Sequence, residues 1–281
     1  MKFTLSICSF FLMSFFVNAQ EFHGEAEYFS KKNTKQKSLK TEASKNEKAD
    51  PEFEKALEQA MKKASEKQYL LTFNKTECLY EEEKKLEKPD ARSSGVSISV
   101  SFSGDGKKYI NTKEKIGIQE DEIFGKEFLI VDPIEKPDWK LLNETKMIGE
   151  YNCFKAELIV PVTDKQNQLY KEYLKKEEIK PTLFKMSKPE DKIVTAWYTP
   201  EIAVSFGPSN YWGLPGLILE INDGNHIILC SKVKLSNKIG TKIKVPNVGE
   251  KVTQKKFDEI QKKKMDSMKD KDGNIIFSTS N

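Results

Sequence analysis

The side chains that could act in acid–base or nucleophilic catalysis are few and badly spaced. The chain has two histidines, His23 and His226, and His226 lies four residues before Cys230. Four residues along a strand span about 13 Å, so this imidazole and thiol share a face but cannot exchange a proton directly. We therefore do not expect a Cys–His catalytic pair here. His226 is interpreted as a strand-end residue, and Cys230 as a buried or disulfide-bonded one.

Motifs for serine hydrolases and metal sites are also missing. No Gly-x-Ser-x-Gly sequence occurs, and Ser205 and Ser209, which flank a Gly-Pro pair, are interpreted as turn residues. Asp266, Asp270 and Asp272 lack the spacing of a calcium loop, and no closely spaced His and Cys set predicts zinc. We expect no cofactor, no metal and no enzymatic activity. The alternative is a hydrolase with an unrecognised site.

Three cysteines follow the N-terminal segment: Cys78, Cys153 and Cys230. None has the CxxC spacing of a redox or zinc site. Cys153 and Cys230 are expected on the more polar face of their strands, so a disulfide between them is feasible if those strands are neighbours. Cys78 is the rival partner for either, and the remaining thiol would stay free or pair with another chain.

Residues 1–19 have the features of a signal peptide. Lys2 provides a charged start, Leu5 to Val17 is apolar but too short to cross a bilayer, and Val17-Asn-Ala19 has the small residues of a cleavage site. We expect export and a mature chain without a transmembrane anchor. Basic and acidic residues number 47 and 43 and are interspersed, which argues against nucleic-acid binding.

Hydrophobic periodicity predicts a sheet with a few helices. Residues 30–50 are polar and expected to be flexible, and 51–64 read as an amphipathic helix after Asp50. Residues 162–191 read as a helical insertion and 253–269 as a C-terminal helix. The expected strands lie at 22–29, 69–74, 96–102, 109–118, 127–131, 139–144, 146–160, 193–199, 217–221 and 226–235.

The segment Tyr211–Asn222 contains the most distinctive turn. Pro215-Gly216 has the composition of a type II turn, and it leads directly into the strand at 217–221. Asp223-Gly224 then predicts a hairpin. The turn carries no acid, base, nucleophile or metal ligand, so it is interpreted as structural. Its structural residues are Gly213, Pro215 and Gly216.

Four sequence blocks resemble the GLPGLI family of exported proteins from Gram-negative bacteria. They occur in the family's order at 139–146, 148–156, 195–202 and 206–218, and the last block contains the motif itself. Glu150 interrupts the second block, and Ala203 follows the third where the family tends to have Pro. The resemblance implies export, a β-rich fold and a genetic association with outer-membrane transport. It supplies no catalytic residues.

Aromatic residues in the last two blocks are the candidate ligand- or partner-binding residues. Exposed Trp and Tyr make good anchors because they bury a large area at a low cost in entropy. The alternative is that they cap one end of the sheet core beside a rigid turn. The candidates are Trp197, Tyr198, Phe206, Tyr211 and Trp212.

The predicted fold is α+β, a mostly antiparallel sheet curved into an open or half-closed barrel with helices packed on one side. Residues 20–281 are expected to form a single domain, and a lipoprotein-carrier half barrel is the nearest shape by analogy. The predicted function is that of a non-enzymatic protein of the periplasm or cell envelope, which binds an apolar or peptide-like ligand or an outer-membrane protein. A purely structural surface component is a further alternative. If the chain is a binding protein, we expect a concave cavity lined by residues of the sheet. If it is an enzyme, we expect a polar cleft in which acid–base groups converge. If it is a structural component, we expect a flat aromatic patch instead.

Overall fold

The computed structural model describes residues 22–32, 66–83, 106–179, 186–236 and 242–268. The expected signal peptide, the helix at 51–64, the strand at 96–102 and all but residues 30–32 of the expected flexible segment lie outside these ranges. Residues 30–32 belong to a strand.

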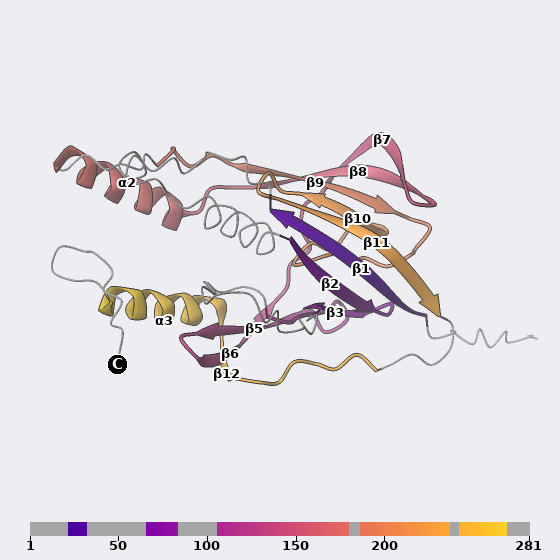
Figure 1. Cartoon of the computed structure of the whole chain (residues 1–281), viewed down its shortest axis with the longest axis horizontal. Coiled ribbons are helices and arrows are strands. Elements are labelled where there is room, and N and C mark those ends of the chain that lie inside the picture. The colour runs from indigo at the N-terminus through magenta and orange to yellow at the C-terminus, as the bar shows by residue number, and fades with distance from the viewer. Residues whose placement is uncertain (1–21, 33–65, 84–105, 180–185, 237–241, 269–281) are drawn as a thin grey trace, which may run out of the picture.

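The described residues form one sheet of twelve strands, shown in Figure 1. Its order is β12-β6-β5-β4-β3-β2-β1-β11-β10-β9-β8-β7, with β12 and β7 at the two ends, so the sheet is not closed into a barrel. Neighbours pair antiparallel except β12 and β6, which are parallel. The strands are β1 (His23–Lys32), β2 (Glu66–Phe73), β3 (Glu77–Glu82), β4 (Lys108–Asn111), β5 (Ile116–Ile123), β6 (Lys126–Pro133), β7 (Lys140–Ile148), β8 (Tyr151–Val160), β9 (Lys192–Thr199), β10 (Leu217–Asn222), β11 (His226–Ser236) and β12 (Glu250–Val252).

Two described helices accompany the sheet, α2 (Asp164–Ile179) and α3 (Gln254–Ser267). Both lie on the same side of the molecule in Figure 1. The α3 helix begins at the N-cap Thr253, whose side chain accepts a hydrogen bond from the Lys256 amide. Its buried residue Phe257 packs edge-on against Phe128 of β6, with ring centroids 5.5 Å apart. A small cluster of Phe257, Phe128, Ile123 and Ile130, with Ile260 and Val252 packed against it, therefore anchors α3 near the β12 end of the sheet.

Two of the expected strand boundaries are wrong. Residues 109–118 form parts of two strands, β4 and β5, because the chain turns between Asn111 and Ile116. Residues 140–148 form one strand, and the turn falls at Gly149, where φ is +59°. Glycine tolerates this left-handed conformation, which other residues seldom adopt. Alternation alone did not reveal either turn.

The main core lies on one face of the sheet, here called the inner face. Strict alternation points Tyr28, Ile110 and Ala196 toward it, and all three are buried. The chain between β9 and β10 packs on this face and contributes four residues to the hydrophobic core: Ile202, Val204, Phe206 and Leu214. The Tyr28 hydroxyl donates a 2.6 Å hydrogen bond to the carbonyl of Ile218. A smaller core of Leu79, Tyr109 and Ile243 covers part of the opposite, outer face.

Candidate ligand-binding pocket

A pocket of about 160 Å³ opens on the inner face, between strands β4–β6 and residues 205–216, here called the Gly-Pro loop. The N-terminus of α3 closes a third side. The inner-face pocket is lined by Lys108, Tyr109, Ile110, Gly117, Ile118, Gln119, Ile130, Asp132, Ile134, Asn210, Trp212 and Gln254.

The strand register brings together the residues that form the floor of the pocket. Lys108 pairs with Gln119, and Gln119 pairs with Ile130, so these three cross the sheet in one row. The next row on the same face runs through Gly117 to Asp132. Gly117 lets the Ile134 side chain pack closely against the strand, because a Cβ atom at this position would lie only 2.8 Å from Ile134.

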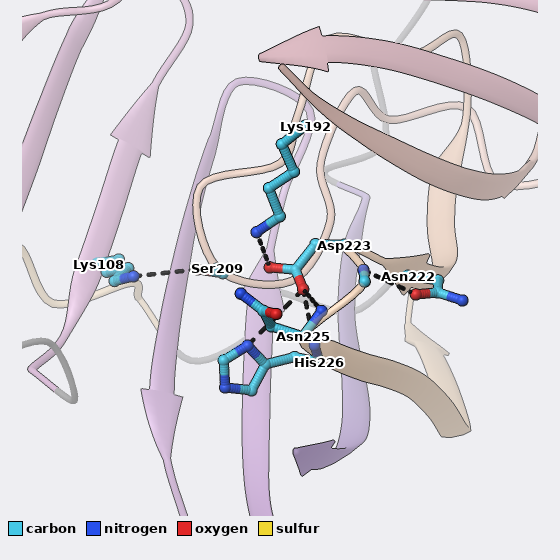
Figure 2. A network of polar contacts seen from close by, with 8 residues as sticks. Lys108, Lys192, Ser209, Asn222, Asp223, Asn225 and His226 are labelled. Carbon is cyan, nitrogen blue, oxygen red and sulfur yellow. Dashed lines mark hydrogen bonds and ion pairs between the residues drawn. The ribbon is translucent and has the colours of Figure 1, made fainter. Parts of the chain in front are cut away.

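Lys108 connects the sheet to the Gly-Pro loop. Its Nζ donates a 3.0 Å hydrogen bond to Ser209 Oγ, as Figure 2 shows. Ser209 has φ of +58°, an uncommon value for a residue other than glycine. The following residues, Asn210 and Trp212, line the pocket. The sequence analysis identified Ser209 only as a turn residue, and no local signal pointed to Lys108.

Asp132 connects the sheet to α3. Its Oδ2 accepts a 2.7 Å hydrogen bond from the backbone amide of Gln254, which is the first residue of the helix. Backbone amides at a helix start lack partners within the helix and attract carboxylates. The contact places Gln254 at the rim of the pocket.

The five aromatic candidates do not gather in one place. Tyr198 is 6% exposed and Phe206 is 0% exposed, so both belong to the core rather than to a binding surface. Trp197 is half-buried on the outer face, where Lys146 Nζ lies 4.4 Å from its ring centroid and pairs with Glu220 at 2.7 Å. The positions of Tyr198, Phe206 and Trp197 fit the alternative that these aromatic residues cap the sheet core.

Tyr211 and Trp212 are half-buried in the Gly-Pro loop. The Trp139 ring meets Tyr211 edge-on with centroids 6.3 Å apart, and its Nε1 donates a 2.8 Å hydrogen bond to the Trp212 carbonyl. Of the five candidates, Trp212 alone lines the described pocket.

The hairpin between β10 and β11 is organised by Asp223, as Figure 2 shows. Its carboxylate accepts hydrogen bonds from Lys192 Nζ at 2.7 Å and from the amides of His226 and Asn225 at 2.7 and 2.9 Å. Burial alone would raise the pKa of Asp223, but Lys192 and these amides lower it overall. Burial, together with the charge of Asp223 and a hydrogen bond to it, raises the pKa of Tyr211 to about 12. Asp223 thus ties the Gly-Pro loop to the hairpin.

The glycines of the motif serve close packing as well as backbone conformation. Gly216 donates to the Leu214 carbonyl at 2.9 Å, which makes a three-residue turn instead of the expected type II turn. A Cβ at Gly216 would lie 2.2 Å from the backbone oxygen of Thr199. Gly213 has φ of +94°. Pro215 lies between them and is exposed.

Cys78, Cys153 and Cys230 are free thiols, and all three are buried. The expected position of Cys153 and Cys230 on a polar face is wrong, because both side chains belong to the inner-face core. Burial raises the pKa of Cys78 well above its usual value, that of Cys153 to about 11 and that of Cys230 to about 12. Such thiols are poor nucleophiles. The pairing of Cys153 with Cys230 stays a prediction.

The remaining candidates do not form a catalytic or metal site in the described ranges. His226 is half-buried, with Nδ1 3.7 Å from Asp223 Oδ1, whereas Cys230 is buried. The described part of the chain contains no group of three or more His, Cys, Asp or Glu residues arranged to hold a metal ion. In the same part, neither helix has the length and apolar character needed to cross a membrane.

These features define the class as an antiparallel β protein with a small mixed pocket on the inner face of its sheet. Within that class, residues 139–220 match the model of a family described as "Protein of unknown function (Porph_ging)". The match covers β7 to β9, the Gly-Pro loop and the start of β10. No curated protein matches the chain.

Solved structures of PNGF-II resemble the fold loosely. The structure in space group P21 is 16% identical, with a TM-score of 0.47, and the match covers 86% of this chain and 34% of that one. The structure in space group C2 is 15% identical, with a TM-score of 0.45, and the match covers 87% and 33%. The chain therefore spans about a third of the length of these proteins.

Proposed function

We propose that this protein is an exported, non-enzymatic binding protein and that its ligand is a small peptide-like molecule held in the inner-face pocket. The observation that carries the proposal is the composition of the pocket wall. Gln119, Asn210 and Gln254 contribute carboxamides, and each carboxamide can both donate and accept hydrogen bonds, as a peptide group does. Ile110 and Ile130 supply an apolar floor for side chains.

The size of the pocket limits the ligand. Its volume of about 160 Å³ lies below the range of roughly 300–1,000 Å³ usual for drug-sized ligands. A ligand of a few residues, or the end of a longer chain, suits this volume. An apolar ligand would leave the carboxamides of the rim without partners, which costs free energy.

The hydrolase alternative finds less support. An enzyme needs two or more acid–base groups within hydrogen-bond reach of one reacting atom. The pocket has two charged side chains, Lys108 and Asp132. Lys108 lies on β4 and Asp132 on β6, with β5 between them, and Asp132 is displaced by two residues along β6 from the residue that lies level with Lys108. Their Cα atoms are therefore separated by about 12 Å. This spacing suits a ligand that extends between them.

We place the protein in the periplasm or envelope of a Gram-negative bacterium. The support comes from residues 1–19, which have the pattern of a signal peptide, and from the resemblance to the exported GLPGLI family. In this proposal the sheet is a half-closed barrel with α2 and α3 on one side, and the ligand enters beside the Gly-Pro loop. An outer-membrane transport protein remains the alternative partner.

Equilibrium dialysis against a mixture of di- and tripeptides, read by mass spectrometry, tests the function. We expect the wild-type protein to enrich a subset of peptides and Trp212→Ala to lose this enrichment. Trp197→Ala, which alters a half-buried tryptophan on the outer face, is the matched control and should behave as wild type. No enrichment by wild type, or equal enrichment by Trp212→Ala, would refute the proposal.

A further inference from the structure

The hairpin between β5 and β6 turns on an exposed aromatic residue. Its two-residue loop, Phe124-Gly125, joins Ile123 to Lys126, and φ is +49° at Phe124 and +82° at Gly125. Such a loop normally begins with Asn, Asp or Gly, because bulky residues seldom adopt a positive φ. The Phe124 side chain is 57% exposed, so packing within the described chain offsets little of this strain. The hairpin thus presents a large apolar ring at its tip that the fold itself does not use.

A second apolar side chain is exposed at the same end of the sheet. β12 runs parallel to β6, and Glu250 lies level with Phe128. The preceding residue, Gly249, lies directly against the start of β6, because a Cβ atom there would be 2.7 Å from the Phe128 amide nitrogen. Val248, which is 47% exposed, therefore lies beside the first residues of β6 and close to the hairpin tip.

The α3 helix adds positive charge beside the tip. It runs alongside the β5–β6 hairpin, as Figure 1 shows, and Lys264 Nζ lies 5.6 Å from the Phe124 ring centroid. Residues 251–268 contain six lysines and three acidic residues, a net charge of +3. Lys262, Lys263 and Lys264 are exposed, and no described carboxylate lies within 4.0 Å of their Nζ atoms.

The carboxylates of the hairpin point away from α3. Glu122 and Glu127 pair across the two strands, so their side chains share one face. The adjacent Ile123 points to the opposite face, where it packs in the cluster of Phe257 from α3. Glu122 also accepts a 2.9 Å hydrogen bond from the Gly125 amide and so stabilises the turn. The side of the tip next to α3 is therefore apolar and basic.

We propose that this end of the molecule docks on an anionic lipid surface. The docking residues, here called the tip surface, are Phe124, Val248, Lys262, Lys263 and Lys264. Aromatic rings favour the level of the lipid headgroups, and lysines close to an anionic membrane bind its phosphates. A protein interface buries about 800 Å² on each side and excludes lysine from its centre, whereas two apolar side chains beside three lysines suit lipid better. This inference does not depend on the ligand of the inner-face pocket.

Vesicle sedimentation of residues 20–281 tests the docking. The vesicles consist of phosphatidylcholine alone, or of phosphatidylcholine with an equal amount of phosphatidylglycerol. We expect saturable binding to the anionic vesicles, little binding to the neutral ones, and weaker binding as salt is added, because salt screens exposed charges. No binding to the anionic vesicles, or equal binding to both kinds, would overturn the proposal.

A triple lysine variant assigns the basic part of the tip surface. Each lysine near an anionic membrane strengthens binding roughly fivefold, so the loss of three should weaken it about a hundredfold. The variant combines Lys262→Gln, Lys263→Gln and Lys264→Gln. The matched control has the same net charge but changes exposed lysines elsewhere, and it should bind nearly as wild type: Lys140→Gln, Lys171→Gln and Lys175→Gln. Equal losses in the two triple variants would show that net charge, and not the tip surface, causes binding.

Variants of Phe124 assign the apolar part. Phe124→Ala should weaken binding to anionic vesicles about tenfold, and Phe124→Trp should keep it, because tryptophan also favours the headgroup level. Leu141→Ala is the control, since Leu141 is 54% exposed on β7 at the other end of the sheet. Unchanged affinity of Phe124→Ala would overturn the insertion of this ring. Sedimentation velocity without vesicles should show a monomer, whereas a dimer that Phe124→Ala abolishes would assign the tip surface to a second copy of the chain and overturn the proposal.

Discussion

Replacement of Phe206 by Ala tests whether the motif region is core or binding surface. The Phe206 side chain is 0% exposed within the inner-face core, and its carbonyl accepts a 2.9 Å hydrogen bond from Ile218. Truncation of a fully buried Phe costs about 3–5 kcal/mol, because contacts are lost and a cavity remains. For a domain of 150–250 residues, each kcal/mol lowers the melting temperature by about 2–4 °C. We therefore expect a decrease of about 6–20 °C.

Differential scanning calorimetry of residues 20–281 measures this decrease in melting temperature. Phe124→Ala is the matched control, because Phe124 is 57% exposed and its ring meets only a lysine ammonium at 5.6 Å among the described aromatic contacts. We expect the control to change stability by about 1 kcal/mol or less. A Phe206→Ala protein with the same melting temperature as the wild type would show that this side chain does not belong to the core. The packing of the Gly-Pro loop on the inner face would then be wrong.

Three further results follow from the same structure. Gly216→Ala should destabilise the protein by about 1–3 kcal/mol in urea unfolding, because the new Cβ meets the Thr199 backbone, and unchanged stability would refute the close packing. The pKa of Tyr211 is raised to about 12, so its contribution to the free energy of unfolding is complete below the usual pKa of about 10 and is lost as the pH rises through 12. The melting-temperature advantage of the wild type over Tyr211→Phe should therefore stay constant up to about pH 10 and narrow between about pH 10 and pH 12, and a constant advantage across that window would contradict this. A thiol reagent should react slowly with the native protein and label three thiols per chain of residues 20–281 in denaturant, whereas a single labelled thiol would indicate a Cys153–Cys230 disulfide.

The sequence predicted the class of fold because the strands alternate clearly. The antiparallel hairpin around Asp223-Gly224 appears where the turn residues place it. The turn between Asn111 and Ile116 escaped detection, because no Gly or Pro lies within it and apolar residues flank both sides. Gly149 was overlooked because residues 146–160 were interpreted as one continuous strand across it. The single-domain interpretation and the role of residues 30–50 stay predictions.

The pocket could not be predicted, because its residues become neighbours only through strand order. Lys108 and Ser209 are 101 positions apart in the chain, and Asp132 and Gln254 are 122 apart. Nothing local distinguishes Lys108 from the adjacent Lys107, which pairs with Glu81 instead. By contrast, Trp212 was identified by its place beside a rigid turn. Residue type indicates which side chains make good binding contacts, but strand register decides which side chains come together in the folded chain.

The most direct test of the central claim is a titration of the ¹⁵N-labelled protein with dialanine, followed by amide and indole chemical shifts. A peptide-binding inner-face pocket predicts saturable shifts at Gly117, Gln119 and the Trp212 indole, with Trp197 on the outer face unchanged. Saturable shifts at Trp197 without shifts at Gly117 and Gln119, or no saturable shift at all, would contradict the claim.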